Sequence, residues 1–399
     1  MIAQKPLAGV RVLDLSRVLA GPFCTMNLAD LGAEVIKIEV PGRGDDSRGY
    51  PPRIPNSDDS GYFYSINRGK QSVTLDLRKA EGAEILLALA GHVDVVVENF
   101  SPGTMERFNL GYPRLHEVNP RIILCSISGF GQTGPMSAAP AYDIVAQALG
   151  GTMSITGAPD GEPTRCGVSI GDLAAALYGL VAVLAALRAR EQTGVGQHLD
   201  IAMLDCQVAW LEDALARFST TGIVPRPIGS RHPSITPFQQ FRAADGYFVA
   251  GCGNEAIWQR FCDAIGASEL KSDPRFATNA DRTANHGALE SILASHFGTK
   301  ERSHWLARLQ DANVPSAPIA TVAEVASNPH LRGREMILSA DHPDFGGLVV
   351  PGSPLKTAGV GGAPNTHAPR LGEHTESVLK RLLGYDEARI SELRGKQVI

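Results

Sequence analysis

The sequence predicts an α/β protein with a doubly wound, Rossmann-like large domain and a smaller α+β domain. Two observations indicate the large domain. Apolar runs at 10–15 and 34–39 flank a helical stretch at 21–31, which is a βαβ unit and therefore implies parallel strands. The runs 93–100 and 121–130 are continuously apolar, as is typical of strands covered on both faces. Together these patterns favour a parallel sheet between two layers of helices.

Further elements of the large domain follow along the chain. Residues 71–77 alternate like a strand, and residues 81–92 have the apolar period of a helix. The apolar stretch 173–187 falls short of the ~20 residues of a membrane span, so it predicts a buried helix. Residues 198–204 suit another strand, which leads into a helix through Arg217.

The smaller domain is indicated by a change in composition. Four prolines lie between residues 225 and 237, which predicts a linker. The run 238–251 predicts a hairpin around an Asp-Gly turn. Helices are then expected near 254–265, 281–297 and 300–312.

These boundaries divide the chain into three segments. We expect residues 1–225 to form the first part of the large domain and to carry its reactive group. Residues 226–320 are expected to form the smaller domain. The segment 321–399 is expected to return to the large domain, with two terminal helices around 373–384 and 386–395.

Composition narrows the classes of partner. The net charge is −5 and no lysine- or arginine-rich run is present, so we expect no nucleic-acid partner. The six cysteines form no Cys-x-x-Cys pair, which is typical of reduced thiols in a cytoplasmic protein. A strand-like run begins by Val10, which leaves no room for a signal peptide, and no membrane partner is expected.

Residues 129–134, GFGQTG, match the Gly-x-Gly-x-x-Gly pattern and follow a predicted strand. A dinucleotide site also requires that the motif open a helix, whose N-terminus holds the pyrophosphate. Pro135 and Pro140 follow immediately and disfavour such a helix. We therefore interpret the motif as a glycine-rich loop.

Asp172 follows Gly171 and opens the most apolar helix of the chain. One interpretation is structural, because aspartate is a preferred helix cap. The other is catalytic, because a helix N-terminus stabilises an ionised carboxylate, which is a competent nucleophile toward an activated acyl group.

Polar residues recur where predicted strands end: Arg17, Glu39, Asn99, Tyr142 and Asp143. Each alone is commonly a turn residue or cap. Because ligands bind at the carboxyl ends of strands in open α/β sheets, we expect these residues to share one crevice. No zinc-protease, nucleophile-elbow or P-loop motif is present, and no metal site is expected.

Several runs resemble, in order, the class III CoA-transferases, typified by carnitine-CoA and formyl-CoA transferases. The runs are PLAGVRVLDLSRVLAGP, GAEVIKIE with PGRGDDSRG, NRGKQSVTLDL, VVVENFSPG, GFGQTGP with AYD, and the terminal LGEHTESVLKRLLGY. The resemblance covers essentially the whole chain. It implies an acyl-CoA donor, a carboxylic acid acceptor, CoA as substrate with no permanently bound cofactor, and an interlocked homodimer.

The resemblance also implies roles for individual residues. The family nucleophile is an aspartate opening a small-residue helix, which matches Asp172; it would form an anhydride with the donor acyl group and then an aspartyl-CoA thioester. The expected CoA-binding residues are Arg17, Ala20, Leu75, Arg78, Asn99, Phe100, Ser101, Arg107, Tyr142 and Asp143. Arginine suits phosphate contacts, although solvated helix charges are the alternative for Arg78 and Arg107.

Two departures from the resemblance stand out. Val40 occupies a position that is basic in some relatives. The tetraglycine loop of formyl-CoA transferase is absent, and GCGN at 251–254 is a differently placed candidate.

Three alternatives to transfer remain open. The first is an α-methylacyl-CoA racemase of the same fold; these enzymes carry a histidine before the aspartate where Tyr142-Asp143 stands here. Tyrosine, with an ordinary pKa near ~10, is the poorer exchange base, which favours transfer. The second is a non-catalytic acyl-CoA-binding protein with Asp172 as a cap, and the third is a nicotinamide dehydrogenase.

The run GSRHPSITPFQQFRAADGYFVAGCGN most resembles family members that handle dicarboxylates, such as succinyl-CoA:glutarate, malate or citramalate transferases. This resemblance implies that Arg231 and His232 bind the second carboxylate of such a substrate. The sequence therefore predicts transfer of CoA from succinyl-CoA or a similar donor to a dicarboxylic acid.

Overall fold

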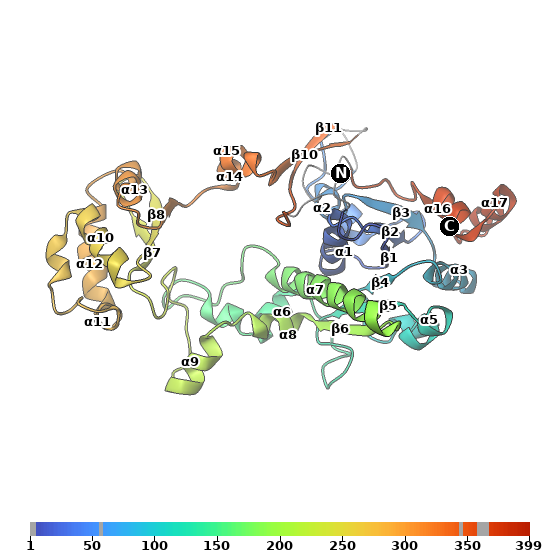
Figure 1. The fold of residues 1–399 in the computed structure, drawn as a ribbon, viewed down its shortest axis with the longest axis horizontal. Helices are drawn as coiled ribbons and strands as arrows, with labels where there is room; N and C mark the ends of the chain where they lie inside the picture. The colour runs from blue at the N-terminus through green and yellow to red at the C-terminus, as the bar shows by residue number, and fades with distance from the viewer. Residues whose placement is uncertain (1–4, 56–58, 343–345, 357–366) are drawn as a thin grey trace. The chain divides into compact units, whose positions relative to one another are not determined.

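A computed structural model describes residues 5–55, 59–342, 346–356 and 367–399 (Figure 1). The chain divides into two compact units. One unit comprises Met1–Thr152, Cys166–Leu215 and Asn328–Ile399. The other comprises Met153–Arg165 and Ala216–Ser327.

The first unit is built on a six-stranded parallel sheet with strand order β3-β2-β1-β4-β5-β6. Its strands are β1 (Arg11–Asp14), β2 (Glu34–Glu39), β3 (Lys70–Thr74), β4 (Val95–Glu98), β5 (Ile123–Ser128) and β6 (His198–Ala202). The predicted α/β class and parallel pairing are confirmed. The strand order reverses between β1 and β4, which opens a crevice at the carboxyl ends of these strands.

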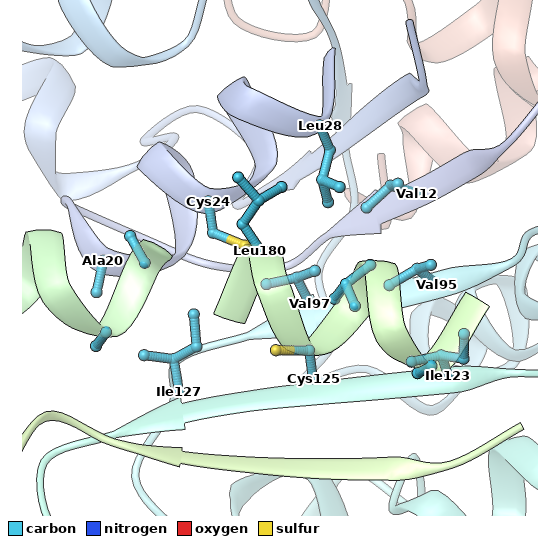
Figure 2. Close-up of a cluster of buried hydrophobic side chains, with 14 of the residues drawn as sticks. Val12, Ala20, Cys24, Leu28, Val95, Val97, Ile123, Cys125, Ile127 and Leu180 are labelled. Atoms are coloured by element: carbon cyan, nitrogen blue, oxygen red, sulfur yellow. The ribbon is translucent and has the colours of Figure 1, made fainter. Parts of the chain in front are cut away.

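Helices cover both faces of this sheet. Helices α1 (Ala20–Asp30) and α7 (Ile170–Thr193) pack on one face, where Figure 2 shows Cys24 and Leu180 beside Val97 and other strand residues. Val12 of β1 belongs to this cluster, whereas the adjacent Leu13 belongs to the cluster on the opposite face. That face is covered by α3 (Ala80–Ala90), α5 (Tyr112–Val118), α16 (Thr375–Leu383) and α17 (Glu387–Gly395).

Helix α7 has 24 residues and is longer than the apolar stretch that predicted it. By length and composition alone it could cross a membrane, but half of its apolar window is buried inside the protein. Ala174, Ala175 and Ala176 are fully buried, because small side chains let α7 lie close to α1 and the sheet. The helix ends at Gly194, which adopts the left-handed conformation that favours glycine.

The remaining elements of this unit are short. They are α2 (Gly61–Ile66), α4 (Thr104–Arg107), α6 (Asp143–Leu149), α8 (Met203–Ala209), α15 (Pro329–Gly333), the antiparallel pair β10 (Ile337–His342) and β11 (Gly346–Pro351), and the 3₁₀ turns η1 (Asp46–Gly49) and η2 (Thr152–Ile155), the last of which continues into the second unit. No helix follows Gly134 before Asp143, so the prediction of a loop at GFGQTG is confirmed.

One predicted helix is interrupted. The sequence predicted a helix from the end of β6 through Arg217, but α8 ends at Ala209 and α9 (Ala214–Thr221) is separate. Between them Glu212 has a φ of 54°, a left-handed conformation that no α-helix continues through.

The second unit is a small α+β assembly. Strands β7 (Phe238–Arg242), β8 (Tyr247–Gly251) and β9 (Ser316–Pro318) form an antiparallel sheet, and the predicted hairpin around the Asp-Gly turn is confirmed. Its other elements are α10 (Glu255–Ile265), η3 (Ser268–Lys271), α11 (Asn279–Ala284), α12 (His286–Phe297), α13 (Arg302–Asp311) and α14 (Val322–Ser327). Buried aromatic rings, among them Phe248, Trp258 and Phe297, fill its core.

Candidate active site

A cavity of about 360 Å³ lies in the crevice at the carboxyl ends of β1, β4 and β5. It brings together residues that are far apart in the sequence. Among the predicted site residues, Arg17, Ala20, Asn99, Phe100, Ser101, Tyr142 and Asp172 line it. Of the five strand-end residues expected to share one crevice, Arg17, Asn99 and Tyr142 line this cavity, whereas Glu39 and Asp143 do not. Asp172 lies on the wall of the same cavity.

A second cavity of about 420 Å³ adjoins the first. Arg17 and Phe100 line both cavities, so the two meet at these side chains. The second cavity is also lined by the predicted Leu75 and Arg78, and by Arg43. The Asp172 carboxylate thus lies in the first cavity, and the second is lined by three arginines together with acidic and apolar residues.

Asp172 is not the cap of helix α7. The cap position belongs to Ser169, and Asp172 lies in the first helical turn. Within the described residues, no hydrogen bond reaches the Asp172 carboxylate. The capping interpretation is therefore wrong, and the carboxylate is left available to a ligand.

The environment of Asp172 raises its pKa to about 7. Burial is the main cause, and the nearby Asp143 carboxylate adds to it. The sequence argument stressed the helix N-terminus, which favours the ionised form, but here burial outweighs it. Asp172 is therefore divided between its neutral and ionised forms near neutral pH.

Asp143 positions the first turn of the helix that carries Asp172. Its carboxylate accepts hydrogen bonds from the backbone N–H of Gly171 and from the side chain of Gln147, both at 2.8 Å. It lies buried beside the first turn of α7 and does not line either cavity. Tyr142 lines the first cavity and is 81% exposed.

Asn99 supports the turn after β1. Its side-chain oxygen accepts a hydrogen bond from the backbone N–H of Arg17 at 2.8 Å, and its amide donates to the Arg17 carbonyl at 2.8 Å. The Arg17 guanidinium lies over the Phe100 ring, 5.4 Å from its centroid. Asn99 therefore holds the backbone that presents Arg17 at the junction of the cavities.

The turn also contains a strained residue that sequence reasoning missed. Val18 lines the first cavity with a φ of 67°, which is rare for a β-branched residue. Its N–H donates to the carboxylate of Asp45 at 3.1 Å, and Asp45 pairs with the fully buried Lys37 at 2.9 Å. Lys37 also donates to the carbonyl of Ser16 at 2.8 Å.

A signal for this support was present in the sequence. Lys37 interrupts the apolar strand EVIKIE, and a buried lysine requires a partner. The loop that follows supplies Asp45. Glu39, a predicted strand-end residue, also serves this loop: it accepts two hydrogen bonds from Arg48, each at 2.7 Å, and one from Asp45 N–H at 2.9 Å.

The other predicted arginines differ in their surroundings. Arg78 pairs with Asp76 through two hydrogen bonds of 2.8 and 3.0 Å and remains largely exposed at the second cavity. Arg107 donates to Thr104 at 2.6 Å and does not line either cavity.

Arg231 and His232 belong to the second unit. The Nε of Arg231 is buried and has no hydrogen-bond partner within the part of the chain that the structure describes. His232 accepts a hydrogen bond from Ser234 N–H at 3.1 Å, and its ring packs edge-on against Phe238.

We expect Asp172→Asn to stabilise the protein in a pH-dependent manner. The folded pKa of about 7 exceeds the unfolded value near 4, so stability is lost as pH rises through this range. Asparagine, which does not ionise, should raise the free energy of unfolding by ~1–2 kcal/mol at pH 8, a value discounted for solvent in the cavity. Urea unfolding at several pH values measures this gain, which should be nearly constant above pH 7 and shrink as the pH falls from 7 toward 4.

The exposed Asp205→Asn is the matched control for this measurement. A gain from Asp172→Asn that is the same at pH 5 and pH 8 would contradict the assignment of a raised pKa to Asp172.

Comparisons with known proteins agree on one family. A model of CoA-transferase family III matches residues 7–375. An acetyl-CoA:oxalate CoA-transferase of Acetobacter aceti is 45% identical over 355 residues, covering 89% of this chain and 90% of that protein. A succinyl-CoA:glutarate CoA-transferase of Mus musculus is 40% identical over 397 residues, covering 100% of this chain and 91% of that protein.

Solved structures give the same result. A CAIB/BAIF family protein from Brucella suis superposes with a TM-score of 0.84 at 38% sequence identity. The superposition covers 95% of this chain and 100% of that one.

Proposed function

The chain belongs to CoA-transferase family III, and on that premise we propose that it moves CoA from succinyl-CoA or a similar donor to a dicarboxylic acid through Asp172. The observation that carries this proposal is the Asp172 carboxylate, which has no hydrogen-bond partner among the described residues and stands in a cavity that joins a second, arginine-lined one. The two relatives described above act on oxalate and glutarate, which are both dicarboxylates.

The two cavities suggest a path for CoA. The nucleotide end would occupy the second cavity, against Leu75 and the charges of Arg17 and Arg78. The pantetheine arm would pass Phe100, which lines both cavities, and bring the thioester to Asp172 in the first. Arginine suits this role because its planar fork matches phosphate oxygens.

The reaction needs only carboxylates and a thiolate. An Asp172 oxygen attacks the donor thioester carbon, the C–S bond breaks, and a mixed anhydride and CoA thiolate form. The thiolate attacks the Asp172 carbonyl of the anhydride, releasing the donor acid and leaving an aspartyl-CoA thioester. The acceptor carboxylate attacks that thioester, and the thiolate released then attacks the acceptor carbonyl, which restores Asp172.

The environment of Asp172 suits this sequence. A carboxylate whose pKa is raised to about 7 by burial remains substantially ionised at neutral pH and is more basic than an exposed aspartate. Donor, enzyme and acceptor all contribute carboxyl groups, so the intermediates lie close in energy and no ATP is required.

Racemisation is the second candidate, and the geometry favours it less. A racemase needs an acid–base pair at the substrate α-carbon. Here the Asp143 carboxylate is occupied by Gly171 and Gln147 and does not line the cavity. We therefore expect no wash-in of deuterium at the α-carbon of 2-methylacyl-CoA in D₂O.

The proposal is tested by incubating the protein with succinyl-CoA and a panel of mono- and dicarboxylic acids, without ATP. We expect new acyl-CoA thioesters from dicarboxylates, detected by chromatography and mass spectrometry. Tight CoA binding without exchange into any acid would instead support the acyl-CoA-binding alternative.

Arg231→Ala should selectively weaken transfer to dicarboxylates. Among the described residues its buried Nε has no hydrogen-bond partner, and its positive charge is complementary to the second carboxylate of an acceptor. We expect kcat/KM for glutarate to fall by ~10–100-fold, because a charge-assisted contact is lost. The kcat/KM for a monocarboxylate should change little. An equal loss of kcat/KM with both classes of acid would contradict the proposed role of Arg231.

We also propose a cytoplasmic homodimer with interlocked chains. Leu177, Tyr178 and Val181 form an exposed apolar group on α7, which a second copy of the chain would cover. All six cysteines are free, which suits a reducing compartment. Light scattering coupled to gel filtration tests the oligomer, and a fully active monomer would contradict it.

A further inference from the structure

Three charged residues meet where the two cavities join. The Asp46 carboxylate forms an ion pair with Arg17, 3.5 Å from its guanidinium nitrogen, and a second ion pair with Arg43. Asp46 lines the first cavity, Arg43 lines the second, and Arg17 lines both. Two guanidinium groups thus share one carboxylate, so these three residues together carry a net charge of +1.

Among the described residues, the Asp46 carboxylate forms no further hydrogen bond or ion pair. Its neighbour Asp45 is buried and holds the loop through Lys37, Val18 and Ser47. In the part of the chain that the structure describes, the Asp46 oxygens accept hydrogen bonds from the two arginines alone. Since the Arg43 side chain is 72% exposed and that of Asp46 27%, these ion pairs are weak and can be exchanged.

The junction is also where a cation is needed. Val40 brings no charge to the second cavity, whereas Arg43, three residues later, brings a guanidinium to the same cavity. A CoA molecule that spans both cavities must pass Arg17 on its way to Asp172. The phosphate groups are the anions that CoA carries outside its acyl part.

We propose that Asp46 is the resting counter-ion of a phosphate site, and that a CoA phosphate replaces its carboxylate on Arg17 and Arg43. This inference rests on the proposed function. It adds that Arg43 binds a phosphate group of CoA, and that the Asp46 carboxylate competes with this phosphate for the two arginines. Phosphate oxygens form stronger charge-assisted contacts with two guanidinium groups than a partly exposed carboxylate does. Removing the Asp46 carboxylate should therefore tighten the binding of CoA.

The test is calorimetric titration of the full-length protein with CoA at low ionic strength. We expect Asp46→Asn to lower the Kd about fivefold and Arg43→Gln to raise it about fivefold, as for exchange of one partly exposed ion pair. Both effects should shrink in 0.5 M NaCl, because salt screens exposed charges. Arg188→Gln and Glu191→Gln are matched controls: this exposed pair has the same spacing and lines neither cavity.

Analogues of CoA and of succinyl-CoA identify which phosphate group occupies the site. With 3′-dephospho-CoA, loss of both effects assigns the site to the 3′-phosphate, and their persistence assigns it to the pyrophosphate. With succinyl-pantetheine, which has no phosphate, the kcat/KM of both variants should equal that of the unmodified protein.

Unchanged or weaker CoA binding by Asp46→Asn would overturn the proposal, as would equal effects on succinyl-pantetheine. These outcomes are separate from failure of the proposed function, which would appear as absence of transfer by the unmodified protein. Unchanged thermal unfolding of Asp46→Asn would show that the loop, held by Asp45, is intact.

Discussion

Asp172→Asn should lower CoA transfer by ~10³-fold or more, because an amide does not replace a carboxylate as the attacking nucleophile. The binding residues of both cavities are untouched by this change, so the Kd for CoA should stay within a few-fold of the original value. Steady-state transfer from succinyl-CoA and direct titration with CoA measure the two quantities separately.

The covalent intermediate gives an independent measurement. After incubation with succinyl-CoA and hydroxylamine, the unmodified protein should carry a hydroxamate on Asp172, located by peptide mass spectrometry. Asp172→Asn should carry none, while Tyr142→Phe should retain it. If Asp172→Asn kept more than a tenth of the original transfer rate, the nucleophile would lie elsewhere.

Lys37→Met should destabilise the protein by ~3–5 kcal/mol, the usual cost of leaving one partner of a buried ion pair unpaired. Lys37 and Asp45 are both fully buried at the side chain, 2.9 Å apart. Burial alone would lower the pKa of Lys37, but the facing Asp45 carboxylate reverses the shift and raises it. Urea unfolding at pH 7 measures the loss.

Two further variants separate charge from packing. Lys37→Met/Asp45→Asn should recover part of the lost stability, because asparagine is neutral and still accepts the Val18 N–H. Lys380→Met removes a half-buried lysine paired with Glu376 and Glu387 at the surface, and should cost no more than ~1 kcal/mol. If Lys37→Met lost as little stability as Lys380→Met, the ion pair between Lys37 and Asp45 would not stabilise the turn at Val18.

Most of the regular elements were predictable because their signals are local. The strand EVIKIE was predicted at 34–39 and is found at Glu34–Glu39, and the terminal helices lie within two residues of their predicted ends. The breaks were not predictable. The predicted helix 281–297 is interrupted at Asn285, whose side-chain amide donates to the carbonyls of Arg275 and Asp281.

The candidate site was predictable in its residues and not in how those residues are used. Asn99 was expected to contact CoA; it lines the first cavity, and its side-chain amide also holds the backbone of Arg17. Asp143 was expected beside the nucleophile, and it caps the first turn of α7 through Gly171. Each of these contacts joins positions 28 or 82 residues apart, so no local pattern could reveal it.

By itself, the sequence determined the α/β class, the parallel strands, the helix that carries Asp172 and the resemblance to a CoA-transferase family. Those properties follow from the periodicity and order of residues along the chain. Only the tertiary structure decided that burial raises the pKa of Asp172 and that no described residue forms a hydrogen bond with its carboxylate. It also decided that Lys37 and Asp45 hold a strained Val18, and that Asp46 lies between two arginines. The reason is physical: burial and electrostatic fields depend on all surrounding atoms, and most of those atoms belong to distant parts of the chain.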